Sequence, residues 1–206
     1  MPTLLIATAN AHKVEEIRAK LRGLGAQDIE LLDLGAYAAY TPPEENGLTF
    51  AANARIKAVA AAAMSGHIAL ADDSGLMVEA LGGAPGVHSA RYAGQGHDDA
   101  ANNAKLLAEL AGTPLKRRQA AFHCSIAIAH PQGELLTAEG RVEGYILEQP
   151  RGRGGFGYDP LFYVTELNRG MAELNMEEKN RVSHRARALE AALPLLLRLL
   201  NYKNMV

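Results

Sequence analysis

The pattern of apolar and polar positions along the chain predicts alternating strands and helices. Residues 4–7 form a short apolar run, which is typical of a buried strand, and residues 29–32 form another. Between them, Val14, Ile17 and Leu21 recur at three- and four-residue spacing, as expected for an amphipathic helix packed on a sheet. A strand followed by a short polar turn and a helix presents helix N-terminal amides to an anion.

Further along the chain, the pattern predicts two more helices and a hairpin. Residues 49–65 are rich in alanine and precede Gly66, which predicts a helix with a glycine stop. Another helix is expected over residues 97–110, where Asp98 and Asp99 are explained as N-terminal residues without chemistry. Residues 119–129 and 134–147 predict two strands joined by a turn at residues 130–133.

The C-terminal part of the sequence carries a helix start and a long apolar face. Asn175 and Glu178 have the spacing of a capping box, and Ser183 is expected to cap the helix that follows. Pro194 lies inside that last helix, where we expect it to kink or break the helix.

The stretch at residues 68–78 is the most informative part of the chain. An apolar run at residues 68–71 ends in Asp72-Asp73-Ser74-Gly75 before an apolar run resumes at residues 76–78. Asp-Ser-Gly is typical of a turn between two strands, so we expect a turn here. Because unpaired buried charges are costly and neighbouring strand side chains point to opposite faces, one carboxylate should face a ligand and the other should anchor the structure. A carboxylate held at a strand end suits Mg²⁺ or an activated water.

The composition of the chain excludes several classes of protein. The 206 residues carry a formal net charge of −2, which gives no electrostatic footprint for nucleic-acid binding. The single cysteine, Cys124, excludes a disulfide framework and indicates a reducing compartment. No signal peptide and no run of about 18 apolar residues is present, so we expect a cytoplasmic protein without membrane contact. Residues 116–118, a run of three basic residues, are expected to form a solvated loop.

Several cations and aromatics lie where a nucleotide could bind. Lys13 lies in a predicted first helical turn, where the helix dipole disfavours a cation unless an anion is also present. The glycine-rich segment at residues 151–160 holds Phe156 and Tyr158, which suits stacking of a flat base and hydrogen bonding to its edge. His184 and Arg185 again lie at a helix start. This set of residues fits phosphate chemistry on a nucleotide but does not identify the bond that is broken.

Five blocks of the sequence resemble the inosine triphosphate pyrophosphatase family. They are Thr8-Ala9-Asn10-x-x-Lys13; Glu44-Glu45-x-Gly47-x-Thr49-Phe50 with Asn53-Ala54 and Lys57; Ala71-Asp72-Asp73-Ser74-Gly75-Leu76 through Gly82-Gly83-x-Pro85-Gly86 to Ser89-Ala90-Arg91-Tyr92; Gly154-Gly155-Phe156-Gly157-Tyr158-Asp159-Pro160; and Glu178-Lys179-Asn180-x-x-Ser183-His184-Arg185. Ala9 departs from the family, which often has glycine there.

The resemblance implies an α/β fold with an elongated mixed β-sheet flanked by helices, and one domain over residues 1–206 whose two lobes enclose an active-site cleft. It implies Mg²⁺-dependent hydrolysis of dITP, ITP and XTP to the monophosphate and pyrophosphate by a homodimer. Such an activity keeps these nucleotides out of DNA and RNA.

The resemblance also assigns roles to individual residues. Asp73 would be the proton acceptor and a Mg²⁺ ligand, and Glu45 would be the second acidic ligand. The triphosphate would be held by Thr8, Asn10, Lys13, Lys57 and Arg91, with Ser74 against the substrate. Phe156 would stack on the base, in a pocket completed by Gly157, Tyr158, Asp159, Lys179, His184 and Arg185.

Two other functions compete with this hypothesis. One is a pyrophosphatase for modified pyrimidine nucleotides on a related two-lobed fold. The other is a nucleotide sensor without turnover, which the complete acidic set disfavours. RNA binding is disfavoured by the net charge and the lack of a basic stripe.

Overall fold

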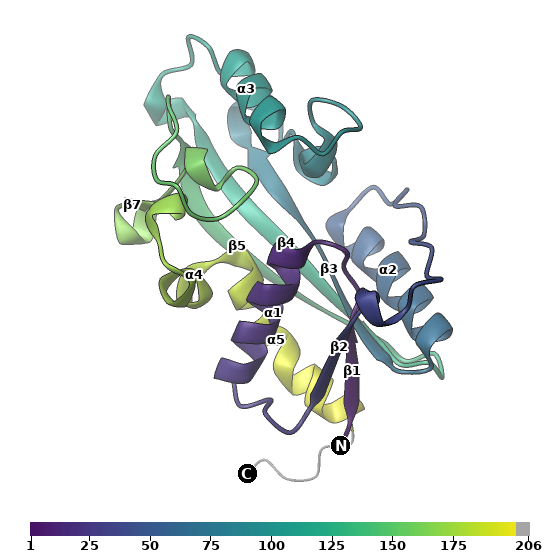
Figure 1. The fold of residues 1–206 in the computed structure, drawn as a ribbon. Coiled ribbons are helices and arrows are strands. Elements are labelled where there is room, and N and C mark those ends of the chain that lie inside the picture. Colours follow the sequence, from purple (N-terminus) through teal and green to yellow (C-terminus); the bar gives the residue numbers. More distant parts are fainter. Residues whose placement is uncertain (201–206) are drawn as a thin grey trace. The chain divides into compact units, whose positions relative to one another are not determined.

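The computed structural model describes residues 1–200, in which seven strands form one sheet in the order β2-β1-β3-β4-β5-β6-β7. The strands are β1 (Thr3–Ile6), β2 (Glu30–Asp33), β3 (Ile68–Val78), β4 (Gln119–Ala129), β5 (Leu135–Ile146), β6 (Phe162–Val164) and β7 (Arg169–Gly170). Strand β1 is parallel to β2 and β3, whereas β6 is antiparallel to β5 and β7. The sheet is therefore mixed, as the resemblance implied (Figure 1).

Helices flank this sheet. They are α1 (Ala11–Gly23), α2 (Phe50–Ser65), α3 (Asp99–Glu109), α4 (Met176–Val182) and α5 (His184–Leu199), with short 3-10 helices η1 (Leu34–Ala36), η2 (Glu79–Leu81), η3 (Gly86–Arg91), η4 (Leu115–Arg117), η5 (Asp159–Leu161), η6 (Thr165–Leu167) and η7 (Met171–Glu173). No helix within residues 1–200 is both long enough and apolar enough to span a membrane.

The described chain divides into two compact units. Unit 1 contains residues 1–73, 124–140 and 184–200, and unit 2 contains residues 74–123 and 141–183. The expectation of a single two-lobed domain stays a prediction.

In unit 1, the alternation of strand side chains builds two cores. Leu4 and Ile6 of β1 pack with apolar residues of α1 and α5, and α1 lies directly against α5. Leu5 of β1 belongs instead to a core shared with α2, built largely from alanines of the helix and strands. Small side chains allow the α2 backbone to lie close to the strands. Figure 1 shows α1 and α5 together on one side of β1 and β2, with α2 on the other.

Unit 2 has a core of its own. Leu76 and Val78 of β3 pack with Leu106 and Leu110 from the region of α3. Phe162 of β6 belongs to the same core, and its ring centroid lies 4.6 Å from that of Phe122.

Several local predictions are confirmed. The α2 helix ends at Gly66 in the left-handed conformation, with φ of 70°. The turn after β4 is closed by the amide of His130, which donates to the Glu134 carbonyl at 2.8 Å. The capping box of Asn175 and Glu178 is present at the start of α4. Each of these features depends on neighbours in the sequence.

Two predictions are wrong, and one alternative of a third is excluded. No turn separates two strands at Asp72, because β3 continues from Ile68 to Val78 as one strand within the sheet. Sheet pairing and buried partners outweigh the local turn preference. Of the two alternatives predicted for Pro194, a break is excluded because α5 continues to Leu199, and a kink stays a prediction. Arg118 is not solvated either: it is 5% exposed and donates to the carbonyls of Thr113, Leu110 and Leu147.

Gly140 of β5 allows the packing of β5 against α5 in unit 1 to be tested. A Cβ atom at this position would lie 2.2 Å from the His184 carbonyl oxygen and 2.3 Å from the Ala188 nitrogen, both in the α5 backbone. We expect Gly140→Ala to lower the free energy of unfolding by about 1–3 kcal/mol, as overpacking does, measured by urea denaturation. Gly23→Ala is the control, because a Cβ there would meet no atom within 4 Å. An unchanged midpoint for Gly140→Ala would contradict this packing.

Candidate functional site

The pleat of β3 sends its two adjacent carboxylates to opposite faces of the sheet in unit 1. Ile68 and Leu70 belong to the core shared with α1 and α5, and Asp72 continues that series toward those helices. Ala69 belongs to the core shared with α2, and Asp73 continues that series toward Lys57 of α2. The two acids therefore have different environments although they are neighbours in sequence.

Asp72 lies in a buried network of charges. Its Oδ2 accepts from Arg185 Nε at 3.1 Å and Nη2 at 3.0 Å, and it pairs with Lys13 Nζ at 3.0 Å. Arg185 also donates to Glu16 of α1. Asp72 and Arg185 are 0% and 1% exposed, so this network is shielded from water.

The network keeps Asp72 ionised. Burial by itself would raise the pKa of Asp72, but the charges of Lys13 and Arg185 hold the pKa well below its usual range. Burial would likewise lower the pKa of Arg185, and the carboxylates of Asp72 and Glu16 reverse that effect, so its pKa is raised. Asp72 is thus a fixed negative charge that anchors other groups, as expected for one member of the pair.

Asp73 has one carboxylate oxygen that no described residue satisfies. Its Oδ1 accepts from Lys57 Nζ at 3.1 Å, whereas its Oδ2 is buried without a hydrogen-bond partner among the described residues. Burial raises the pKa of Asp73, although Lys57 and Lys13 oppose this effect. An unsatisfied buried carboxylate oxygen is costly unless a ligand or a water completes it.

Glu45 reaches the same lysine from the loop before α2. Lys57 Nζ donates to Glu45 Oε2 at 3.0 Å, so the two carboxylates converge on one ammonium group. Burial would lower the pKa of Lys57, but Asp73 and other nearby acids raise it, so Lys57 stays charged.

This donor set fits Mg²⁺. The ion is commonly held by one or two carboxylates, with water and substrate phosphates as its other ligands. Asp73 offers a buried oxygen without a hydrogen-bond partner in the described residues, and Glu45 offers a second carboxylate that pairs with the same lysine. Among residues 1–200, no group of three or more His, Cys, Asp or Glu side chains could hold a metal ion. A magnesium site here would thus depend on phosphate oxygens and water to complete its coordination.

The polar turn after β1 is shaped by its own side chains. Asn10 Oδ1 accepts from the Lys13 amide at 3.2 Å and caps α1, and the Asn10 amide donates to Thr8 Oγ1 at 3.3 Å. The first turn of α1 directs the Lys13 amine to Asp72. Lys13 therefore has an intramolecular carboxylate partner near the helix start, which the sequence pattern did not indicate.

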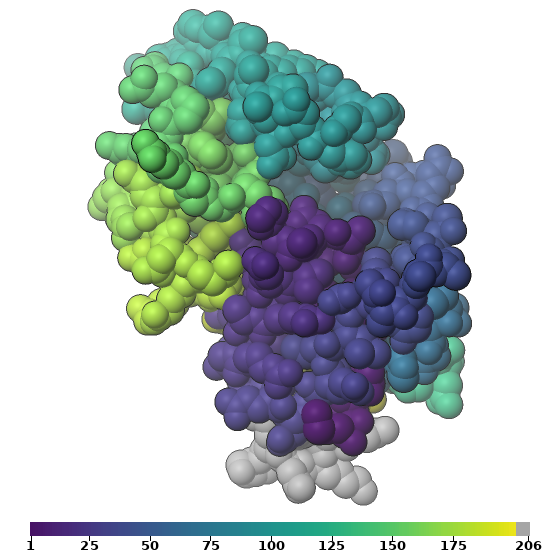
Figure 2. All heavy atoms as spheres, in the orientation of Figure 1, coloured from purple at the N-terminus to yellow at the C-terminus, as the bar shows by residue number. Residues whose placement is uncertain are grey.

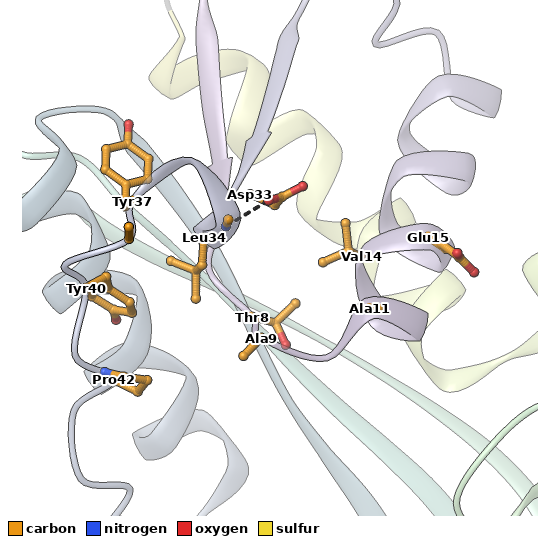
Figure 3. Close-up of a pocket in the computed structure, with 12 residues that line it drawn as sticks. Thr8, Ala9, Ala11, Val14, Glu15, Asp33, Leu34, Tyr37, Tyr40 and Pro42 are labelled. Atoms are coloured by element: carbon orange, nitrogen blue, oxygen red, sulfur yellow. Dashed lines mark hydrogen bonds between the residues drawn. The ribbon is translucent and has the colours of Figure 1, made fainter.

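A pocket of about 580 Å³ borders this turn within unit 1 (Figure 3). Thr8, Ala9 and Val14 lie toward one side, and Tyr37 and Tyr40 lie toward the other (Figure 3). Its full lining is Thr8, Ala9, Ala11, Val14, Glu15, Asp33, Leu34, Gly35, Tyr37, Ala38, Tyr40 and Pro42. The spheres of α1 and of the segment after β2, in purple and dark blue, lie on the surface in Figure 2. The pocket was not predicted, because the loop after β2 has no recognisable motif.

In unit 2, the glycine-rich segment brings several predicted residues together. Asp159 Oδ2 accepts from the Phe156 amide at 3.0 Å and from Lys179 Nζ at 2.7 Å. The Lys179 ammonium lies 4.6 Å from the centroid of the Phe156 ring. Asp159 and Lys179 are 3% and 5% exposed, so this pair is buried. The segment is therefore held in a defined conformation.

Tyr158 and its neighbours have other partners. The Tyr158 hydroxyl donates to the Ser89 carbonyl at 2.8 Å, and burial raises the pKa of Tyr158 well above its usual range. Ser74 and Arg91 are half-buried elsewhere in unit 2. In unit 1, His184 is buried next to Arg185 at the start of α5.

Two residues with contacts to this segment were missed from the sequence. Asp99 and Asn103 of α3 both bind the backbone of Gly157. The available signal was the Asp98-Asp99 pair, because one aspartate is enough to cap a helix, and Asp98 is the residue that does so.

The chain is similar throughout to known proteins. The profile of the Ham1 family matches residues 4–195. The dITP/XTP pyrophosphatase of Desulforamulus reducens is 54% identical over 196 residues, which cover 95% of this chain and 96% of the relative. The dITP/XTP pyrophosphatase of Geobacter sulfurreducens is 53% identical over 189 residues, covering 92% and 94% of the two chains.

Solved structures give the same result. A HAM1 protein from Coxiella burnetii superposes with a TM-score of 0.85 at 42% identity, covering 96% of this chain and 100% of that one. A nucleoside-triphosphatase, dITP/XTP pyrophosphatase, from Mycobacterium abscessus has a TM-score of 0.75 at 45% identity, covering 94% and 99%.

Two arginines of α5 allow the buried network to be tested. Arg185→Met leaves Asp72 and Glu16 buried without their shared guanidinium, and we expect unfolding to become easier by about 3–5 kcal/mol. Arg198→Met is the matched control, because Arg198 pairs with Glu134 at a site where the side chains are 61% and 54% exposed. That exposed pair should contribute about 1 kcal/mol or less. Equal losses in urea denaturation would contradict the buried network.

Proposed function

Because the chain belongs to the Ham1 family, as its match over residues 4–195 shows, we propose that it hydrolyses dITP, ITP and XTP to the monophosphate and pyrophosphate. The names of the relatives, dITP/XTP pyrophosphatase, support this substrate class. The structural observation that carries the proposal is Asp73, which has one buried oxygen without a hydrogen-bond partner in the described residues and shares Lys57 with Glu45. The activity would remove non-standard purine nucleotides before they enter DNA and RNA.

Asp73 is the proposed proton acceptor. Its carboxylate orients a water molecule and takes a proton from it as the water oxygen bonds to the α-phosphorus. The bond from that phosphorus to the α-β bridging oxygen breaks, and pyrophosphate leaves. A directly positioned carboxylate base requires no covalent intermediate.

Asp73 and Glu45 are also the proposed ligands of Mg²⁺. When bound, the ion would neutralise phosphate charge and polarise the phosphorus. Lys57 and Lys13 supply cations next to the two β3 aspartates, and these cations suit the charge of the triphosphate. The other proposed contacts of the triphosphate are Thr8, Asn10 and Arg91. Ser74 would lie against the substrate.

The proposed base site is the glycine-rich segment of unit 2. Phe156 would stack on the base, and Gly157, Tyr158, Asp159 and Lys179 would surround it. The buried Asp159–Lys179 pair, with the ammonium close to the Phe156 ring, supports this assignment.

Donors to the 6-oxo group would explain the rejection of adenine. We propose His184 and Arg185 for this role; the Arg185 guanidinium also pairs with Asp72 and Glu16. The 6-amino group of adenine is itself a hydrogen-bond donor, so it would not accept a hydrogen bond from these residues. Such mismatches reject substrates by orders of magnitude. Guanine shares the 6-oxo group, so discrimination against GTP must arise at the 2-amino position.

We further propose that the protein is a homodimer of the cytoplasm. The dimer follows from the family resemblance, and light scattering would test it by giving a mass twice that of the 22.0 kDa chain. The buried free thiol of Cys124 supports a reducing compartment.

A substrate panel tests the proposed function. With Mg²⁺ present, pyrophosphate release should be faster from dITP, ITP and XTP than from ATP and GTP, and a chelator should abolish it until Mg²⁺ is restored. A preference for ATP or GTP would contradict the specificity. Turnover of dTTP or UTP would favour a pyrimidine pyrophosphatase, and ITP binding without turnover would favour a sensor.

A single substitution tests the role of Asp73. Asp73→Asn removes the base but preserves the shape of the side chain, so kcat for ITP should fall by about 100-fold or more, the usual range for a general base. Circular dichroism should show an intact fold. Asp28→Asn is the control, because Asp28 is exposed in a loop of unit 1 and should retain wild-type activity. Near-normal turnover of Asp73→Asn would remove this residue from the chemistry.

A further inference from the structure

Gly157 is held on both sides of its backbone by the first turns of α3. Its amide donates to Asp99 Oδ2 at 2.7 Å, and its carbonyl accepts from Asn103 Nδ2 at 2.8 Å. Asn103 Nδ2 also donates to the Asp99 carbonyl at 2.8 Å, so the two anchoring side chains are connected to each other through the helix. Both contacts lie within unit 2.

These contacts fix a residue with no side chain of its own to hold it. Gly157 has φ of +62°, in the left-handed region that favours glycine, and a Cβ atom there would meet nothing within 4 Å. Its position therefore depends on its backbone partners. Phe156 and Tyr158, on either side, carry the rings assigned to the base site.

The contacts of Asp99 differ from those of the residue before it. Asp98 is the N-cap of α3, and its Oδ1 accepts from the amides of Ala100 and Ala101 at 2.9 and 3.1 Å. The helix start is thus already capped without Asp99. The Asp99 carboxylate instead reaches a segment 58 residues further along the chain.

The same helix turn also holds the segment around Arg91. Asn102 Oδ1 accepts from the Ala93 amide at 2.7 Å, and Asn102 Nδ2 donates to the Ala90 carbonyl at 3.2 Å. The start of α3 thus contacts two segments that carry proposed substrate residues. Asn102 serves the segment with Arg91, whereas Asp99 and Asn103 serve the segment with Phe156.

We propose that Asp99 and Asn103 are positioning residues of the base site, which fix the Gly157 peptide so that Phe156 is presented to a purine base. This inference rests on the proposed function, because it takes the glycine-rich segment as the base site. It goes further in giving α3 a role in recognition of the base. The phosphates should be bound independently of these two side chains.

Substitutions at neighbouring positions separate this role from helix stability. Asp99→Ala removes the Gly157 anchor, and Asp98→Ala removes only the helix cap. Asp99→Asn restores an acceptor for the Gly157 amide. Asn103→Asp keeps the size of the side chain but removes the N–H that donates to the Gly157 carbonyl. Melting temperatures for all four variants show whether each protein is folded.

We expect the substitutions that remove a Gly157 contact to weaken recognition of the base but not of the phosphates. Asp99→Ala and Asn103→Asp should each raise KM for ITP about three- to tenfold, the order expected for loss of one hydrogen bond. IMP should inhibit both variants more weakly by the same factor. Their kcat should stay within about twofold of wild type, a shift worth only a few tenths of a kcal/mol. Inhibition by tripolyphosphate, which has no base, should stay within the same twofold range. Asp98→Ala should lower the melting temperature without changing KM, and Asp99→Asn should recover wild-type KM.

Three results would overturn the inference. They are equal KM values for Asp99→Ala and Asp98→Ala, failure of Asp99→Asn to recover KM, and a loss of tripolyphosphate inhibition as large as the loss for IMP. If the wild-type protein does not hydrolyse ITP, the proposed function fails. Calorimetric titration with IMP then still tests whether Asp99 positions the base site. Weaker IMP binding by Asp99→Ala than by Asp98→Ala would support positioning, and equal or absent binding would exclude it.

Discussion

The structure of unit 1 depends on the two-residue period of β3 at Asp72 and Asp73. Because successive strand side chains point to opposite faces, two adjacent carboxylates enter different environments. Asp72 joins α1 and α5 through Lys13 and Arg185, whereas Asp73 faces Lys57 of α2. A turn at this point, as the local sequence favours, would end this separation. The continuous strand is thus the feature that lets one carboxylate anchor the fold while the other remains available.

The buried charges around Asp72 impose a constraint on the surrounding helices. An ion pair removed from water gains little net stability, but loss of one partner leaves an uncompensated charge. Arg185 lies between Asp72 and Glu16, so α5, β3 and α1 must keep their relative positions within unit 1 for all three charges to be compensated. Small residues reinforce the same arrangement, since Gly140 of β5 permits close contact with the α5 backbone. The buried charges and the close packing at Gly140 therefore both fix the position of α5 within unit 1.

The sequence predicted features whose causes are local and missed those whose causes are distant. Helix α2 with its Gly66 stop, the turn after β4, and the capping box at Asn175 follow from residues a few positions apart. The mixed sheet came from the family resemblance, not from periodicity. By contrast, Arg185 and Glu16 are 169 positions apart, and the Asp99 partner is 58 positions away. Arg118 was misassigned for the same reason, because a basic run does not show which of its members will meet buried carbonyls.

The same physical difference supports the choice between the two candidate carboxylates. Asp72 Oδ2 has Lys13 and Arg185 around it, and its pKa is held far below the usual range, so it is a poor proton acceptor. Asp73 is less strongly compensated, since burial raises its pKa and one buried oxygen has no hydrogen-bond partner in the described residues. A base and metal ligand needs an available oxygen more than it needs a strong ion pair. The environment of each acid therefore favours Asp73 for chemistry and Asp72 for structure, a distinction that the pair Asp-Asp alone could not provide.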